Sequence, residues 1–248
     1  MRITRALLGS LVLLLLAAPS LRSQDFAIRR WLLRGALPAD TGAAGVVGDY
    51  IGGEAALRPD SGEVAAGGAF ITADADSLGR VNLGRALPNA RDWTVAYAVA
   101  YVQAPQEMTA QLVMDSDDDL VALLNGQRIW VNVVARGGGT GSDTVTVRLA
   151  AGWNTLVLKV RNRSGGFDVT GRLAPAAGER TLDGLRSSAR RPPELAAGHN
   201  RPATTLIASP IRLSGMLTWN GDELESHASL SISAWGPAAL RGVSARFE

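Results

Sequence analysis

The chain has 248 residues, of which 46% are hydrophobic and 19% charged, so it can bury a core and is not disordered throughout. Its formal charge is +2, but Arg2, Arg5 and Arg22 lie in the first 23 residues, so the remainder is near neutral, about −1. This balance argues against nucleic acid or an anionic membrane as partner. The absence of cysteine excludes disulfides and thiolate metal sites.

Residues 1–23 are typical of an export signal. Two arginines precede the apolar stretch 6–16, which is too short for a comfortable membrane span. The small residues Ala18 and Ser20 predict cleavage after Ser20, with cleavage after Ser23 and an uncleaved anchor as the alternatives. We therefore expect a secreted or periplasmic protein that touches a membrane only if the signal is retained.

The mature chain opens with strand-like residues and a small-residue stretch. Residues 25–38 predict a first strand around Trp31, and residues 40–68 are rich in Gly, Ala and Asp. Short strands around Phe70 and Val81 follow.

Residues 93–103 give the clearest strand pattern. Large side chains alternate there with small ones, which predicts a strand buried on both faces. We expect the large residues to share one buried face, in the same core as Leu156, Leu158 and Val160. These large residues are Trp93, Val95, Tyr97, Val99 and Tyr101.

Further strands follow at a spacing of about 8–12 residues, separated by Gly-rich turns. Asn125-Gly126 is a strong signal for a tight hairpin between two of them. Together they predict an all-β fold, an antiparallel β-sandwich that is jelly-roll-like and spans residues 24–174. These strands are expected at residues 109–114, 120–124, 128–134, 143–149, 153–160 and 167–173.

The C-terminal part has a different composition. Residues 175–203 are rich in Pro and Arg and predict a linker or a wrapping arm. Residues 204–248 return to strand patterns at 211–219, 224–235 and 240–247, and Asn220-Gly221 predicts a hairpin. Because so few strands are marginal alone, this small C-terminal β-hairpin unit should pack on the sandwich or on a partner.

The order of motifs over residues 31–173 resembles a β-sandwich module of exported bacterial proteins. That module is akin to the protective-antigen-type lectin-like domain and to the sugar-binding jelly roll of family-two glycoside hydrolases. The chain departs from the pattern at Ala36-Leu37, where Pro-Phe is usual, and at Asp119, where a glycine is usual. The matching residues are Trp31 and Gly35, the run 49–54, Tyr97 to Tyr101, Ser116-Asp117-Asp118, Asn125-Gly126, Gly152-Trp153-Asn154 and Leu158-Lys159-Val160.

The resemblance implies a calcium site at the paired aspartates. In the lectin-like relatives such a pair binds Ca²⁺, which holds sugar hydroxyls, so Asp117 and Asp118 would be the metal ligands here. Asn132 or Asp143 could complete the oxygen set that calcium prefers. The alternative is a structural turn in which the aspartates accept backbone hydrogen bonds, and we favour it.

Aromatic rings are the other candidate ligand contacts, because CH groups of sugars stack on a ring face. Trp130 and Trp153 are the first candidates and Trp219 and Trp235 the second, although most aromatics on strands are core residues.

Catalytic motifs are hard to find. The two histidines, His199 and His227, fall in the Pro-rich stretch and the C-terminal unit, and no Gly-x-Ser-x-Gly or His-Glu-x-x-His motif occurs. We therefore expect a non-enzymatic module that binds a glycan or cell-envelope polymer, with Ca²⁺ as its one candidate cofactor. A structural module that docks another exported protein and an unrecognised secreted hydrolase remain the alternatives.

Overall fold

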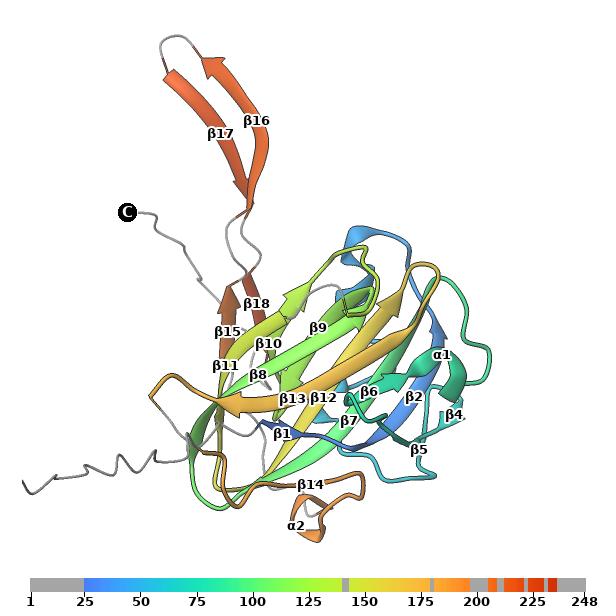
Figure 1. The fold of residues 1–248 in the computed structure, drawn as a ribbon. Coiled ribbons are helices and arrows are strands. Elements are labelled where there is room, and N and C mark those ends of the chain that lie inside the picture. Colours follow the sequence, from blue (N-terminus) through green and yellow to red (C-terminus); the bar gives the residue numbers. More distant parts are fainter. Residues whose placement is uncertain are drawn as a thin grey trace, which may run out of the picture.

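A computed structural model of the protein describes residues 25–139, 143–178, 181–196, 205–208, 212–220, 223–229 and 232–235, the last four ranges as backbone only. The predicted export signal and the predicted strand 240–247 lie outside these residues. The described part is almost entirely antiparallel β-structure arranged as two packed sheets, as the sequence predicts (Figure 1). Within that part no helix has both the length and the apolar character needed to cross a membrane.

The smaller sheet has five strands in the order β1-β13-β8-β11, with β6 beside β1 on the same flank of β13. All of its ladders are antiparallel. Its strands are β1 (Phe26–Ala27), β6 (Arg80–Asn82), β8 (Met108–Asp117), β11 (Asp143–Leu149) and β13 (Asp168–Pro175).

The larger sheet has seven strands in the order β10-β9-β12-β7-β2-β5. The seventh, β14 (Arg186–Ser188), pairs with the part of β7 that β2 does not reach. The others are β2 (Arg30–Pro38), β5 (Ile71–Asp74), β7 (Thr94–Ala104), β9 (Asp119–Leu124), β10 (Gln127–Asn132) and β12 (Gly152–Asn162). Asn125 and Gly126 both have positive φ, 52° and 84°, as the predicted tight turn between β9 and β10 requires.

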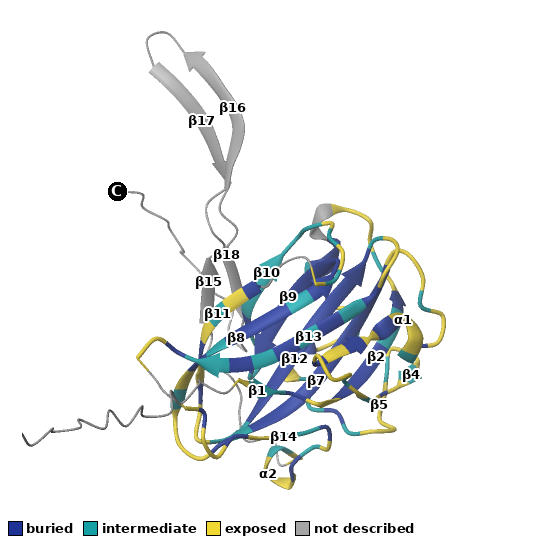
Figure 2. Ribbon diagram, in the orientation of Figure 1, coloured by how far each residue is buried: buried dark blue, intermediate teal, exposed yellow. Residues whose placement is uncertain are grey.

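The central strand β7 is buried on both faces, as its alternation predicts (Figure 2). The assignment of its faces was wrong, however. Its small residues Ala96, Ala98 and Ala100 face the core between the sheets, and Leu156, Leu158 and Val160 lie in that same core. Its large residues face the other way, into a second core, which holds Val95, Tyr97, Val99 and Tyr101 with Leu32, Val121, Leu123 and Val157.

The second core is closed by residues 39–70, which we call the covering segment. It contains the 3-10 helices Ala43–Val47 and Glu54–Ala56 and the short hairpin of β3 (Val64–Ala65) and β4 (Gly68–Ala69). Val46 and Phe70 from this segment are buried in the second core. A stretch with little hydrophobic periodicity therefore forms a third layer over the larger sheet.

Cationic side chains of the sheet hold this layer through its backbone carbonyls. Lys159 donates to the Gly48 carbonyl at 2.7 Å, and Arg161 donates to those of Asp40 and Gly42. The Arg34 guanidinium donates to the carbonyls of Ala65 and Ala66. The small residues of the covering segment bring these carbonyls close to the sheet, so that its buried cationic side chains can reach them.

The described part of the Pro-rich stretch lies on the sandwich. It comprises β14 and the helical turn α2 (Pro193–Ala196), and Ala189 and Leu195 pack into the second core. The other helical turn, α1 (Leu83–Ala86), follows β6. In the C-terminal unit the backbone forms two pairs, β15 (Thr205–Ala208) with β18 (Ile232–Trp235) and β16 (Arg212–Asn220) with β17 (Glu223–Ser229). The predicted strand 224–235 is thus two strands.

Candidate functional site at one end of the sandwich

The acidic turn lies where the chain crosses from one sheet to the other. Asp117 ends β8 in the smaller sheet and Asp119 begins β9 in the larger one, so Asp118 is the single residue between them. The end of β12 pairs with the start of β9 and of β7, which brings residues 91–94 and 161–164 to the same end of the molecule.

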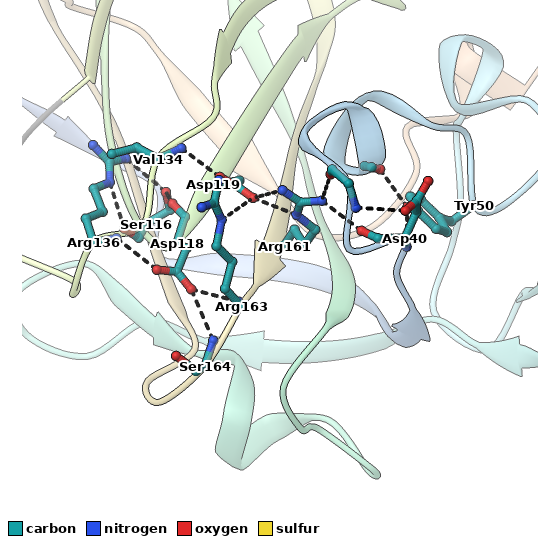
Figure 3. Close-up of polar contacts among 12 residues, drawn as sticks. Asp40, Tyr50, Ser116, Asp118, Asp119, Val134, Arg136, Arg161, Arg163 and Ser164 are labelled. Atoms are coloured by element: carbon teal, nitrogen blue, oxygen red, sulfur yellow. Dashed lines mark hydrogen bonds and ion pairs between the residues drawn. The ribbon is translucent and has the colours of Figure 1, made fainter.

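Asp118 fastens two loops to this turn. One of its carboxylate oxygens accepts the Arg136 backbone N–H at 2.8 Å, and the other accepts that of Arg163 at 2.7 Å and that of Ser164 at 3.4 Å. Figure 3 shows both oxygens used in this way. The carboxylate therefore satisfies backbone donors of both loops, and it is only 5% exposed.

Asp119 is the centre of a charged network. Its carboxylate is fully buried and pairs with Arg161 at 2.6 Å and with Arg163 at 2.8 Å, while the Val134 backbone N–H donates to it as well (Figure 3). The hydrogen bond to the Asp119 carboxylate raises the pKa of Arg163, and partial burial opposes that rise. A glycine, which the resembled module usually has at position 119, could not hold these two arginines, so Asp119 has a structural role here.

Asp117 has a different environment. Burial raises its pKa, the Gly138 N–H at 3.2 Å opposes that rise, and the charges of Asp118 and Asp115 add to it. Asp168, opposite Asp117 on β13, also has a raised pKa because of burial, with Arg80 opposing and Asp117 adding to the rise. This is a like-charged pair, with Arg80 3.8 Å from Asp168.

The two residues proposed to complete a calcium site bond to each other and to an arginine. Asn132 donates to Asp143 at 2.8 Å, and Asp143 pairs with Arg136 at 2.7 Å. In the described residues no three His, Asp or Glu side chains are grouped closely enough to share a metal ion. The carboxylate of Asp118 accepts backbone N–H groups, as it would in a structural turn.

The structure does not bring the two candidate tryptophans together. Trp130 on β10 is partly buried against the core between the sheets, whereas Trp153 on β12 packs against the second core. They lie on opposite faces of the larger sheet and cannot form one platform. Trp219 and Trp235 lie on β16 and β18, for which only the backbone is described.

Sequence reasoning misplaced Trp93, which was expected in the core. The residue precedes β7, has φ of 57° and is 37% exposed. Its alternation with Val95 continues the strand pattern, so the pattern gives no signal that the strand begins only after Trp93. Trp93 is the one aromatic residue among the large exposed hydrophobic residues of the described chain.

The glycosylation sequon Asn162-Arg163-Ser164 also belongs to this end of the sandwich. Asn162 is only 2% exposed, and its side-chain amide donates to the Arg91 carbonyl at 3.2 Å. The side chain thus holds the loop that precedes β7 and is not available for a glycan in the folded chain.

No protein-family model and no curated protein matches the chain. It is similar to solved structures of family 35 carbohydrate-binding modules. One, from an environmental isolate, is 13% identical with a TM-score of 0.32, over 66% of this chain and 97% of that one. Two structures from Clostridium thermocellum have TM-scores of 0.27. The native one is 18% identical over 33% of this chain and 72% of that one. The other is 20% identical, over 41% of this chain and 95% of that one. These likenesses are weak, and the site described above rests on the chain's own residues.

Proposed function

We propose that this chain is a non-enzymatic binding module of an exported protein, with a carbohydrate or cell-envelope polymer as ligand. The observation that carries the proposal is the network of Asp118, Asp119, Arg136, Arg161 and Arg163, which fixes loops from both sheets at one end of the sandwich (Figure 3). Loops already held in place lose little conformational freedom on binding, so such a surface suits a ligand that offers only hydroxyl groups.

The rest of the described sandwich offers fewer exposed groups that could bind a saccharide. The outer face of the larger sheet is covered by residues 39–70 and 181–196, and its aromatic side chains lie in the second core. The polar end, in contrast, carries side chains of both charges that reach solvent, among them Asp40, Arg91 and Asp92. Saccharide hydroxyls both donate and accept hydrogen bonds, and these side chains match both roles.

Asp117 and Asp168 are two carboxylates opposite each other on β8 and β13, and their surroundings argue against a hydrolytic pair. A Cβ built on Gly166 would lie 2.3 Å from an oxygen of Asp117, and one built on Gly138 equally close to Asp168. Both carboxylates are thus packed against glycine backbone, whereas a glycosidase needs a sugar ring between its two carboxylates.

A glycan array probed with the mature full-length protein tests the proposal, with and without a chelator. We expect binding to at least one bacterial or plant polysaccharide. Failure to bind any glycan or isolated cell-envelope polymer would overturn the proposal. Loss of binding in chelator would show that the site needs a metal ion.

One observation favours a second function, docking of another protein through the C-terminal unit. The register of β16 and β17 pairs Trp219 with Leu224 and Leu213 with Ala228, so two cross-strand pairs of this two-stranded hairpin consist of apolar residues. A hairpin alone is marginally stable. Light scattering of the full chain at increasing concentration tests whether a second copy is the partner; a constant monomeric mass would exclude it.

A further inference from the structure

Trp93 is a tryptophan in a position that neither burial nor backbone geometry favours. Its φ of 57° lies in the left-handed region, which is strained for a bulky side chain. Its 37% exposure means that packing against the core does not offset that strain. An exposed indole at a strained backbone position points to a role for its exposed surface.

The protein side of the ring is held firmly. The Arg161 guanidinium lies 5.6 Å from the ring centroid. Arg161 is itself only 1% exposed and is fixed by Asp119 and by the carbonyls of Asp40 and Gly42. Because this cation is buried, it contacts the ring from within, and the exposed part of the indole faces solvent.

The backbone around Trp93 is also fixed. Its carbonyl accepts the Ala39 N–H at 2.9 Å, and the Arg91 carbonyl accepts both the Thr94 hydroxyl and the Asn162 amide. The ring is thus presented by a turn that is tied to β12 and to the start of the covering segment, so it needs little ordering before it binds a ligand.

Polar side chains border the indole. Arg91 and Asp92 precede it and are exposed, Asp40 is exposed beside Ala39, and Arg163 is 26% exposed and shares the Asp119 carboxylate with Arg161. Two of these four groups are basic and two acidic. The border therefore suits an uncharged ligand with many hydroxyls better than a polyanion.

We propose that the exposed face of Trp93 is the stacking platform of a binding site for a neutral polysaccharide, which rests on the carbohydrate-binding function proposed above. The CH face of one sugar ring lies on the indole, and its hydroxyls bond to Arg163 and to the carboxylates of Asp40 and Asp92. Arg161 is the positioning residue, because it holds the ring and does not itself reach solvent.

The test is affinity electrophoresis of the full-length mature protein in gels that contain soluble neutral polysaccharides, namely hydroxyethylcellulose, xylan, galactomannan and pullulan, and in gels with polygalacturonate. We expect at least one neutral polymer to retard the wild type, and Trp93→Ala to weaken that binding at least tenfold. Trp93→Phe should retain part of it, and Leu78→Ala, which shortens a side chain exposed elsewhere, should retain all of it.

Trp93→Gly guards against a mere folding defect. Glycine tolerates the positive φ, so this variant should melt no lower than the wild type and still lose binding. If the wild type is retarded and Trp93→Ala equally so, the platform is wrong and the carbohydrate function stands. Retardation by polygalacturonate alone overturns the neutral ligand, and no retardation together with an empty glycan array overturns both proposals.

Discussion

The Glu54 carboxylate and the Lys159 ammonium lie 2.7 Å apart, and neither side chain is exposed. Glu54 belongs to the covering segment and Lys159 to β12, so the pair joins the third layer to the sheet. The Tyr97 hydroxyl donates to the same carboxylate oxygen at 3.0 Å, and Arg128 lies 3.6 Å from the other. Burial lowers the pKa of Lys159, and Glu54 opposes this.

Breaking this pair should be costly. Lys159→Met leaves a buried carboxylate without its closest cation, and such a loss typically costs about 3–5 kcal/mol. The double variant Glu54→Gln, Lys159→Met should lose clearly less than the sum of the two single variants, because no isolated charge remains. Urea unfolding of the four proteins measures the coupling. Additive losses would show that the two charges do not depend on each other.

Asp168 should destabilise the protein at neutral pH. A carboxyl whose pKa is raised in the folded state contributes stability below its unfolded pKa and loses it as pH rises through the folded pKa. Asp168→Asn should therefore stabilise at pH 7 by about 0.2–1 kcal/mol, as expected for relief of opposed like charges, and the gain should vanish near pH 4. Denaturant melts at both pH values measure it, with Asp92→Asn as control. A less stable variant at pH 7 would mean that attraction to Arg80 outweighs the repulsion.

Val99 tests the second core. Its side chain is fully buried between β7 and the covering layer, so Val99→Asp should cost several kcal/mol and lower the melting temperature severely. Val64→Asp is the matched control, because Val64 is 73% exposed and its replacement should change stability by no more than about 0.5 kcal/mol. An unchanged melting temperature for Val99→Asp would show that this core is misplaced.

The period-two pattern of β7 predicted burial on both faces but could not say what covers each face. Its alanine face meets the other sheet because Trp31 and other large side chains already fill that space. Its tyrosine face meets the covering segment, whose Gly- and Ala-rich sequence has no apolar periodicity of its own. That layer is held by Lys159, Arg161 and Arg34 binding to carbonyl groups, and side-chain patterns carry no information about such bonds.

The candidate site was predicted only in part. Asp117 and Asp118 stand out in the sequence because they are adjacent, and the structure places them at a sheet-to-sheet crossing. Their neighbours Arg136 and Arg163 come from distant loops that meet only when both sheets have formed. Trp93 was missed because it continues the strand's alternation, while its positive φ is visible only in the structure.

Thermal melts can decide whether the acidic turn binds calcium or is only a structural turn. If Asp117 and Asp118 bind calcium, the ion binds the folded chain and not the unfolded one. A calcium concentration of about 100 times the dissociation constant then raises the free energy of unfolding by about 2.7 kcal/mol. The melting temperature would then rise by several degrees and fall again in chelator. We expect a small or absent effect, because both oxygens of Asp118 already accept backbone N–H groups.

The same contacts set the expected result for Asp118→Asn. An asparagine offers only one acceptor oxygen, so its NH₂ group would face the backbone N–H of Arg136 or of Arg163, and one partly buried donor would lose its partner. Such a loss costs about 1–3 kcal/mol with or without calcium. Asp92→Asn removes one exposed charge at the same end of the sandwich and should change little. Thermal melts of the three proteins in calcium and in chelator decide the matter. A wild-type shift of several degrees in calcium that Asp118→Asn abolishes would show that the carboxylate is a metal ligand as well as the fastener of two loops.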